Sequence, residues 1–424
     1  MPPAMELPID VLGEIFVVCV TNEQRTRRET AIQCEGCKPL RIPSVLAQVC
    51  RQWRCAALST PSMWRFIHLD LKTSCQVALR KEQFSKLFQR HVGLSGSCPL
   101  ELSFANLGSD EGFNTVMNII GTENNVAKRV KRLEIGLAGA AFLPFLSILQ
   151  RAVTPNLEDL VLYHTGYFTP HESIPPEALI AFEKTPLKRL SLGRIQWCTM
   201  DVSLSGITSL SIDLGHEHEA ILLRTLTSFP NLVELTLQCT DNFKVLDSWE
   251  PIPAATLPAL ERISFDPRIC HYSLHKLDAP KLTYITARNF SRLSPRFLAY
   301  LPNQTAYTTL RIERFTPEDD WRFKQSGKSH WNYKSLEELR VEWTSSFTAG
   351  VPGFLACLKN HPEILTLELV ECSIDSEYMH NLTTDASLLP KLTELRLSKC
   401  PNICPRVLDT IASERRSLSV FVTL

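Results

Sequence analysis

A six-residue pattern, apolar-x-x-apolar-x-apolar, recurs along most of the chain. Clear copies occupy residues 157–162, 187–192 and 207–212, and others begin at Leu232, Leu260, Leu282 and Leu392. From residue 157 to residue 392, successive copies begin 20 to 30 residues apart, with a mean of about 26. A single copy occurs by chance in any leucine-rich chain, but a sustained period predicts a structural unit that is repeated. We therefore expect a short strand in every copy.

The positions of proline support the same repeat. In six copies a proline lies two residues before the first apolar position; these are Pro155, Pro230, Pro258, Pro280, Pro362 and Pro390. Proline has no N–H group and a fixed φ, so it can end the preceding segment and set the entry to a strand. Amphipathic stretches at 176–182, 220–226 and 406–411 predict helices between strands. The predicted fold class is therefore α/β, with an irregular leucine-rich-repeat solenoid that has parallel strands on its concave face and helices on its convex face.

Alternate strand residues are expected to point away from the core and to form a surface for a partner. Tyrosine and arginine are common at binding hot spots. The candidate substrate-binding residues are Tyr163, Tyr284, Arg288, Arg311 and Arg340. Carboxylates at Glu313, Glu338, Glu342 and Glu368 accompany them and would repel phosphates, which favours a protein or peptide partner over nucleic acid. The alternative is that these are ordinary solvated strand residues.

The N-terminal region does not follow the repeat. Val11, Leu12, Ile15 and Phe16 predict a short amphipathic helix, a polar insertion follows at about 20–42, and a second helix is expected after Pro43. We predict a helical domain at 1–72, a helical linker with a first capping repeat at 73–129, and the solenoid at 130–424. A few short helices cannot bury so many large apolar residues, so part of their surface should be a docking face.

The order of these residues resembles a known family. The segments Leu7-Pro8-x-Asp10-Val11-Leu12, Val49-Cys50-Arg51-Gln52-Trp53-Arg54 and Pro61-Ser62-Met63-Trp64 resemble the F-box, particularly the form found in basidiomycete fungi. The resemblance implies a substrate-recognition adaptor of an SCF-type cullin-RING ubiquitin ligase, in which the F-box docks on a Skp-type adaptor and the repeats bind the protein to be ubiquitinated. The implied docking residues are Leu7, Pro8, Leu12, Ile15, Val49, Cys50 and Trp53. Two alternatives remain open: these helices only cap the first repeat, or the chain is a protein-interaction scaffold that is not coupled to ubiquitination.

Composition narrows the remaining functions. The 45 basic and 45 acidic residues give no net charge to attract nucleic acid or an anionic membrane, and only 16 of 424 residues are glycine. The sequence has no G-x-G-x-x-G, G-x-x-x-x-G-K-[ST], H-E-x-x-H or G-x-S-x-G motif. We expect no enzymatic activity and no cofactor.

Metal binding and membrane insertion are not expected either. Cys34-Glu-Gly-Cys37 is the only C-x-x-C, and no second ligand pair follows at zinc-site spacing. The first 20 residues carry Glu6, Asp10 and Glu14 where a signal peptide is apolar, and no apolar stretch reaches membrane-spanning length. These features predict a cytoplasmic or nuclear protein.

Overall fold

The computed structural model divides the chain into two compact units, Met1–Cys198 and Thr199–Leu424. The residues that the structure describes are 7–30, 42–70, 86, 88–107, 124–137, 155–164, 173–174, 185–193, 196–197, 203–213, 219–238, 254–266, 276–288, 308–315, 336–343, 358–359, 361–372, 379–380, 388–400, 403, 405–415 and 417–423.

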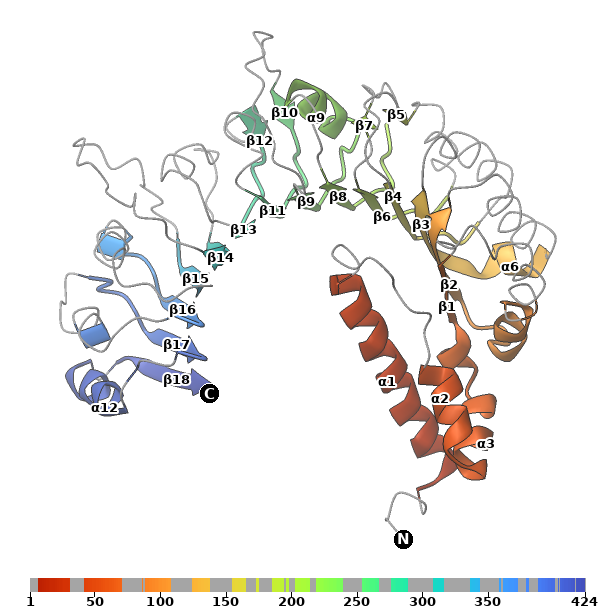
Figure 1. Cartoon of the computed structure of the whole chain (residues 1–424). Coiled ribbons are helices and arrows are strands. Elements are labelled where there is room, and N and C mark those ends of the chain that lie inside the picture. The colour runs from red at the N-terminus through yellow and green to blue at the C-terminus, as the bar shows by residue number, and fades with distance from the viewer. Residues whose placement is uncertain are drawn as a thin grey trace. The chain divides into compact units, whose positions relative to one another are not determined.

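The first unit opens with a helical module. Its helices are α1 (Ile9–Thr30), α2 (Ile42–Val49) and α3 (Arg51–Ser59) (Figure 1). The short 3-10 helix η2 (Pro61–Trp64) follows them. They enclose a core of Leu12, Phe16, Val20, Ala56, Ala57, Met63, Trp64 and Phe66. The indole N–H of Trp64 donates to the Ala57 carbonyl at 2.8 Å, so the buried tryptophan has its polar group satisfied. The Pro-x-x-Trp segment thus completes the core of the module with Trp64.

The first helix is longer than predicted. It continues through Thr30, so residues 21–30 of the polar insertion predicted at about 20–42 belong to this helix instead of following it. Polar residues such as Glu23 and Gln24 are good helix formers, so the polarity of this segment does not end the helix. Val20 is buried and the Gln24 side chain donates to the Glu101 carboxylate at 3.2 Å, which ties the C-terminal half of the helix to the sheet. Residues 31–41, with the Cys34–Cys37 pair, lie outside the described part.

The second predicted helix is two helices. The chain is extended at Cys50, with φ −156° and ψ 176°, and the Cys50 sulfur accepts from the backbone N–H of Trp53 at 3.4 Å. The Arg54 side chain donates to the Ala47 carbonyl at 2.9 Å. These contacts pair a backbone N–H and a backbone carbonyl that the two helix ends would otherwise leave unpaired. The helix can therefore break at Cys50, although the apolar residues on both sides keep helical spacing.

The sheet of the first unit is parallel throughout. Its strands lie in the order β1 (Phe66–Asp70), β2 (Leu100–Leu107), β3 (Val130–Leu137), β4 (Asp159–His164) and β6 (Arg189–Gly193). Helix α6 (Asn124–Arg129) precedes β3, and β5 (Ser173–Ile174) pairs with β7 (Gln196–Trp197). The sheet begins at Phe66 rather than at Val130, so strands β1 and β2 fall in regions predicted to be the helical domain and the linker.

The second unit continues with the same type of strand. In order, its strands are β8 (Ser209–Asp213), β9 (Glu234–Gln238), β11 (Arg262–Phe265), β13 (Tyr284–Arg288), β14 (Thr309–Phe315), β15 (Glu338–Trp343), β16 (Thr366–Val370), β17 (Glu394–Ser398) and β18 (Ser419–Thr423). Every neighbouring pair is parallel. Strand β10 (Ala255–Thr256) pairs with β12 (Leu277–Asp278), and the described helices are α9 (Glu219–Leu226) and α12 (Pro405–Glu414). The last two confirm the predictions at 220–226 and 406–411, while 176–182 lies outside the described residues.

Buried leucines and proline turns set the repeat. Strands begin two residues after the first apolar position of each copy, as at Leu232, which is fully buried. Just before that position the N–H of residue i+3 bonds to the carbonyl of residue i, for example from Leu232 to Phe229 at 3.1 Å and from Leu282 to Ala279 at 3.1 Å. Proline occupies position i+1, where its fixed φ suits a β-turn. The N-terminal helices followed by a parallel-strand solenoid confirm the predicted α/β fold class.

Candidate protein-binding surfaces

Helix α1 has apolar residues on two sides. Leu12, Phe16 and Val20 face the core and are at most 2% exposed. Val11, Ile15 and Val18 follow one another at i, i+4 and i+7 and are 42%, 43% and 57% exposed. Residues at this spacing lie on one stripe of a helix, so α1 presents an apolar stripe that its own module does not cover.

The same property extends to the other two helices of the module. Val45 and Val49 are four residues apart on α2 and are more than half exposed, and Leu58 on α3 is also exposed. Ile9 at the start of α1 adds a further exposed apolar side chain. Seven of the ten large apolar residues that are exposed in the described part of the chain thus belong to this module. Apolar side chains gathered on the surface of one small module are typical of a protein-docking site.

The predicted docking residues have different surroundings. Pro8, Ile15 and Val49 are exposed, whereas Leu7, Cys50 and Trp53 are partly buried. Trp53 packs on Phe16 with ring centroids 5.0 Å apart, and the Leu7 carbonyl accepts from the Gln52 side chain at 2.8 Å. Leu12 is a core residue, and its burial leaves it no surface for a partner.

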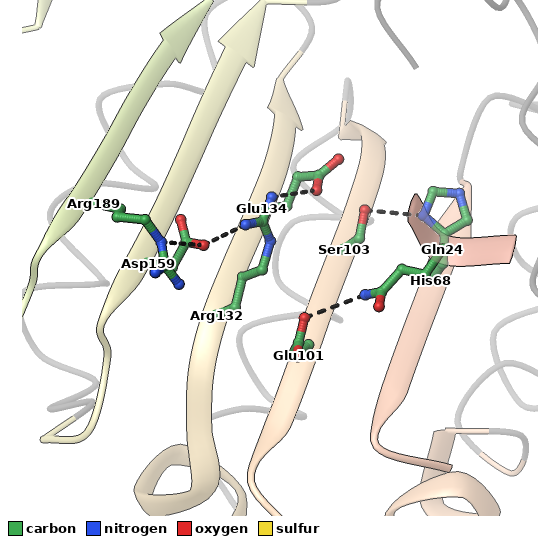
Figure 2. Close-up of polar contacts among 8 residues, drawn as sticks. All are labelled: Gln24, His68, Glu101, Ser103, Arg132, Glu134, Asp159 and Arg189. Carbon is green, nitrogen blue, oxygen red and sulfur yellow. Dashed lines mark hydrogen bonds and ion pairs between the residues drawn. The ribbon is translucent and has the colours of Figure 1, made fainter. Parts of the chain in front are cut away.

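We define the polar face of the first unit as the sheet side that carries residues 159, 161 and 163 and their register partners. The polar face of the second unit is the side that carries residues 234, 236 and 238 and their register partners. In the first unit this face is internally paired (Figure 2). Asp159 is 3% exposed and accepts from Arg132 on one neighbouring strand and from Arg189 on the other, the latter at 3.2 Å. Arg132 also pairs with Glu134 at 3.5 Å. Ion pairs between neighbouring strands stabilise the strand register. Their charged groups are already paired, so they are less available to bind a partner.

Next to this network two further contacts link β1, β2 and α1. The ring Nδ1 of His68 lies 2.9 Å from the Ser103 hydroxyl, and Gln24 reaches Glu101, as Figure 2 shows. Tyr163 lies on the same face, where its register partner is Gly193. A Cβ atom built on Gly193 would be 2.9 Å from the Tyr163 Cβ, so glycine leaves room for the tyrosine. Of the five predicted substrate-binding residues, only Tyr163 belongs to the first unit.

The other four predicted residues lie together in the second unit. Tyr284, Arg288, Arg311 and Arg340 come from the three consecutive strands β13, β14 and β15, and all four are partly buried. Register places Arg311 beside Arg340, and Arg340 beside Glu368, with which it forms an ion pair at 2.8 Å. The structure therefore brings these residues to one region of the polar face. It also shows that Arg340 already has an acidic partner.

Several surface residues were missed from the sequence. Val18 and Val45 are exposed apolar residues of the helical module, and Phe421 is 53% exposed on β18 with Arg396 as its register partner. The helical spacing of Val11, Ile15 and Val18 in the sequence would have been enough to predict that Val18 belongs to this stripe. Nothing in the sequence distinguishes Phe421 from a core residue, because its exposure depends on its position in the last described strand.

Among the described residues, no group of three or more His, Cys, Asp or Glu side chains could hold a metal ion. His216 and His218 lie outside this part of the chain. No helix in the described ranges is long and apolar enough to cross a membrane.

Comparison with known proteins gives structural likeness only. No protein-family model matches the sequence, and no curated protein matches it. The leucine-rich-repeat protein LegL7 from Legionella pneumophila is similar at a TM-score of 0.39 and 13% identity, over 84% of this chain and 98% of that one. Rad7, solved with Elc1 from yeast, has a TM-score of 0.29 and 14% identity, over 82% and 88%. A TLR13 chain solved with ssRNA13 has a TM-score of 0.37 and 16% identity, over 70% of this chain and 45% of that one. The fold assignment rests on the strand register above.

Proposed function

We propose that the chain is a non-catalytic substrate-recognition adaptor of an SCF-type cullin-RING ubiquitin ligase. The helical module docks on a Skp-type adaptor, and the solenoid holds the protein to be ubiquitinated. The observation that carries the proposal is the exposed apolar stripe of Val11, Ile15 and Val18, which lies opposite the buried face of the same helix. This stripe belongs to the segment that resembles the F-box. A ligase adaptor would act in the cytoplasm or nucleus.

Exposed apolar side chains are unfavourable in water, and docking on a partner would bury this stripe. Each exposed valine or isoleucine that becomes buried in an interface contributes roughly 1 to 2 kcal/mol, in proportion to the area removed from water. Leu12 and Phe16 hold the helix in place, so they support the surface without contacting the partner. Ile15 and Val49 remain as contact residues in this proposal, and Trp53 positions α3 against α1 through its contact with Phe16.

The test is capture of a purified Skp-type adaptor by the full chain. Ile15→Glu should lower adaptor affinity by roughly tenfold or more, because a carboxylate cannot be buried there without a partner. Leu365→Glu is the matched control, since Leu365 is an exposed apolar residue of the second unit. Equal capture by the wild type and the Ile15→Glu protein would refute docking by the stripe. Absence of capture by a folded wild-type chain would favour the scaffold without ligase coupling.

For the substrate, we propose the region around Tyr284, Arg288, Arg311 and Arg340. Three neighbouring strands present an aromatic ring and three guanidinium groups here, which suits a protein partner with acidic and apolar groups. Reversing the charge of Arg340 would place two carboxylates side by side, since Glu368 is its partner. Arg340→Gln together with Tyr284→Ala is therefore the better variant. Proximity labelling should recover fewer partners while adaptor capture is unchanged; identical partner sets would refute this region.

A further inference from the structure

Cys372 and Cys400 occupy the same position in two successive repeats. Each lies two residues after the end of a strand, β16 or β17. Each follows a residue with positive φ, which is 55° at Glu371 and 53° at Lys399. The backbone N–H of Glu371 donates to the Ser398 carbonyl at 2.8 Å, so the two repeats stay hydrogen-bonded beyond the strand ends. The two cysteines are thereby held in register.

Both sulfur atoms point toward the preceding repeat. The Cys400 sulfur is 3.5 Å from the Leu369 carbonyl oxygen on β16, and the Cys372 sulfur is 3.7 Å from the Val341 carbonyl oxygen on β15. Cys372 and Cys400 also lie close enough to influence the pKa of each other. Adjacent parallel strands are about 4.8 Å apart, within the Cα separation that a disulfide spans. The register therefore places the two cysteines on neighbouring repeats at a strand spacing that is compatible with a disulfide.

The two thiols differ in reactivity. Cys372 is fully buried, and burial raises the pKa of its thiol. The pKa of Cys400 is lowered to about 7, first because the Cys372 thiol hydrogen-bonds to it, and despite its own partial burial. The nearby charges are Glu342 on β15, which further raises the pKa of Cys372, and the Glu371–Lys399 ion pair at 3.0 Å. Cys400 is the more exposed of the two and the better nucleophile.

We propose that Cys372 and Cys400 are a modification site for small disulfide oxidants such as oxidised glutathione. The Cys400 thiolate attacks one glutathione sulfur, a new S–S bond forms, and the first glutathione leaves as a thiolate. Cys372 then attacks the Cys400 sulfur and breaks the mixed disulfide, and the second glutathione leaves with the Cys372 proton. One glutathione disulfide is reduced to two thiols while the two cysteines are oxidised to one disulfide. The product covalently joins two neighbouring repeats, and the inference does not depend on the proposed ligase role.

The experiment treats the full chain with oxidised glutathione at pH 7, blocks free thiols and maps peptides by mass spectrometry. The background is Cys404→Ser, because Cys404 would share a tryptic peptide with Cys400. Cleavage after Lys391 and Lys399 separates the two cysteines, so a disulfide is seen as two linked peptides that together lack two hydrogen atoms. Accumulation of a glutathione adduct on Cys400 without the linked peptides would overturn the proposal.

Two variants test the roles of the thiols. With Cys372→Ala the glutathione adduct on Cys400 should persist. It should also form roughly threefold more slowly at pH 7, since the Cys400 pKa would return toward about 8.5 and the lost thiolate fraction outweighs the gain in nucleophilicity. With Cys400→Ala the buried Cys372 should remain unmodified. An unchanged rate in the first variant, or modification of Cys372 at the wild-type rate in the second, would show that the thiols do not act as a pair. Cys55, an exposed cysteine of α3, serves as the internal reference for oxidant exposure in every sample.

Discussion

Replacement of Asp159 tests whether the buried ion-pair network holds the strands of the first unit together. Asp159→Ala removes a carboxylate that is almost fully buried and that bridges Arg132 and Arg189 across three strands. A hydrogen bond to a charged group contributes about 1.5 to 3 kcal/mol when it is shielded from water. The Arg132 side chain is only 19% exposed, so its contact with Asp159 should contribute a free energy within that range. Arg189 is 58% exposed, so its contact contributes less than about 1 kcal/mol. The expected loss of unfolding free energy is therefore about 1.5 to 4 kcal/mol.

The matched control is Arg189→Ala, which removes only the exposed contact. It should cost less than about 1 kcal/mol and leave Asp159 paired with Arg132. Because the chain has two units, a single unfolding midpoint mixes their contributions. Hydrogen exchange of the β3, β4 and β6 amides measured by mass spectrometry gives the local effect. If the Asp159→Ala and Arg189→Ala proteins exchange these amides at the same rate, the carboxylate does not stabilise the register as argued.

Three further substitutions test the helical module and one strand end of the second unit. Phe16→Ala should destabilise the module by about 3 to 5 kcal/mol, because it empties a buried ring site against Trp53, while Val18→Ala should change stability by less than about 0.5 kcal/mol. Limited proteolysis of the module ranks the two, and equal protection would contradict the assignment of the buried face. Lys399→Gly should stabilise the second unit by up to about 1 kcal/mol, because Lys399 has a φ of 53° and its ion pair with Glu371 is exposed. Faster hydrogen exchange of the β16, β17 and β18 amides in this variant would contradict strain at this positive φ.

The repeat could be predicted from the sequence because its apolar pattern is local and recurs many times along the chain. Each strand needs buried residues at fixed spacing, and six copies also have proline at the second position of the preceding turn. An irregular copy can therefore be recognised from the others. The pairing of Arg340 with Glu368 follows from the same period, since the two residues are 28 positions apart and neighbouring strands are in register. The start of the sheet at Phe66 was missed because β1 and β2 carry no such repeated copy.

The helical module was harder to predict because its ends depend on single contacts. The break at Cys50 needs one sulfur that accepts one N–H, and the apolar spacing on either side gives no sign of it. The length of α1 depends on Val20 meeting the core and on Gln24 reaching Glu101 in the sheet. Which side of α1 faces outward is decided by where α3 and η2 pack, so the resemblance located the helix but did not separate Leu12 from Ile15.

The two candidate surfaces differ in the physics that a partner would use. On the helical module the exposed residues are aliphatic, so burial of apolar area would provide the affinity, and a single charge introduced there should be enough to disrupt docking. On the polar face of the sheet the charges are partly neutralised by one another, as at Arg340 and Glu368, and a partner must exchange those contacts for its own. Such an exchange contributes little net free energy but penalises a partner with the wrong charge pattern. In the proposed function, apolar burial on the module would hold the adaptor, and the charge pattern of the sheet would select the substrate.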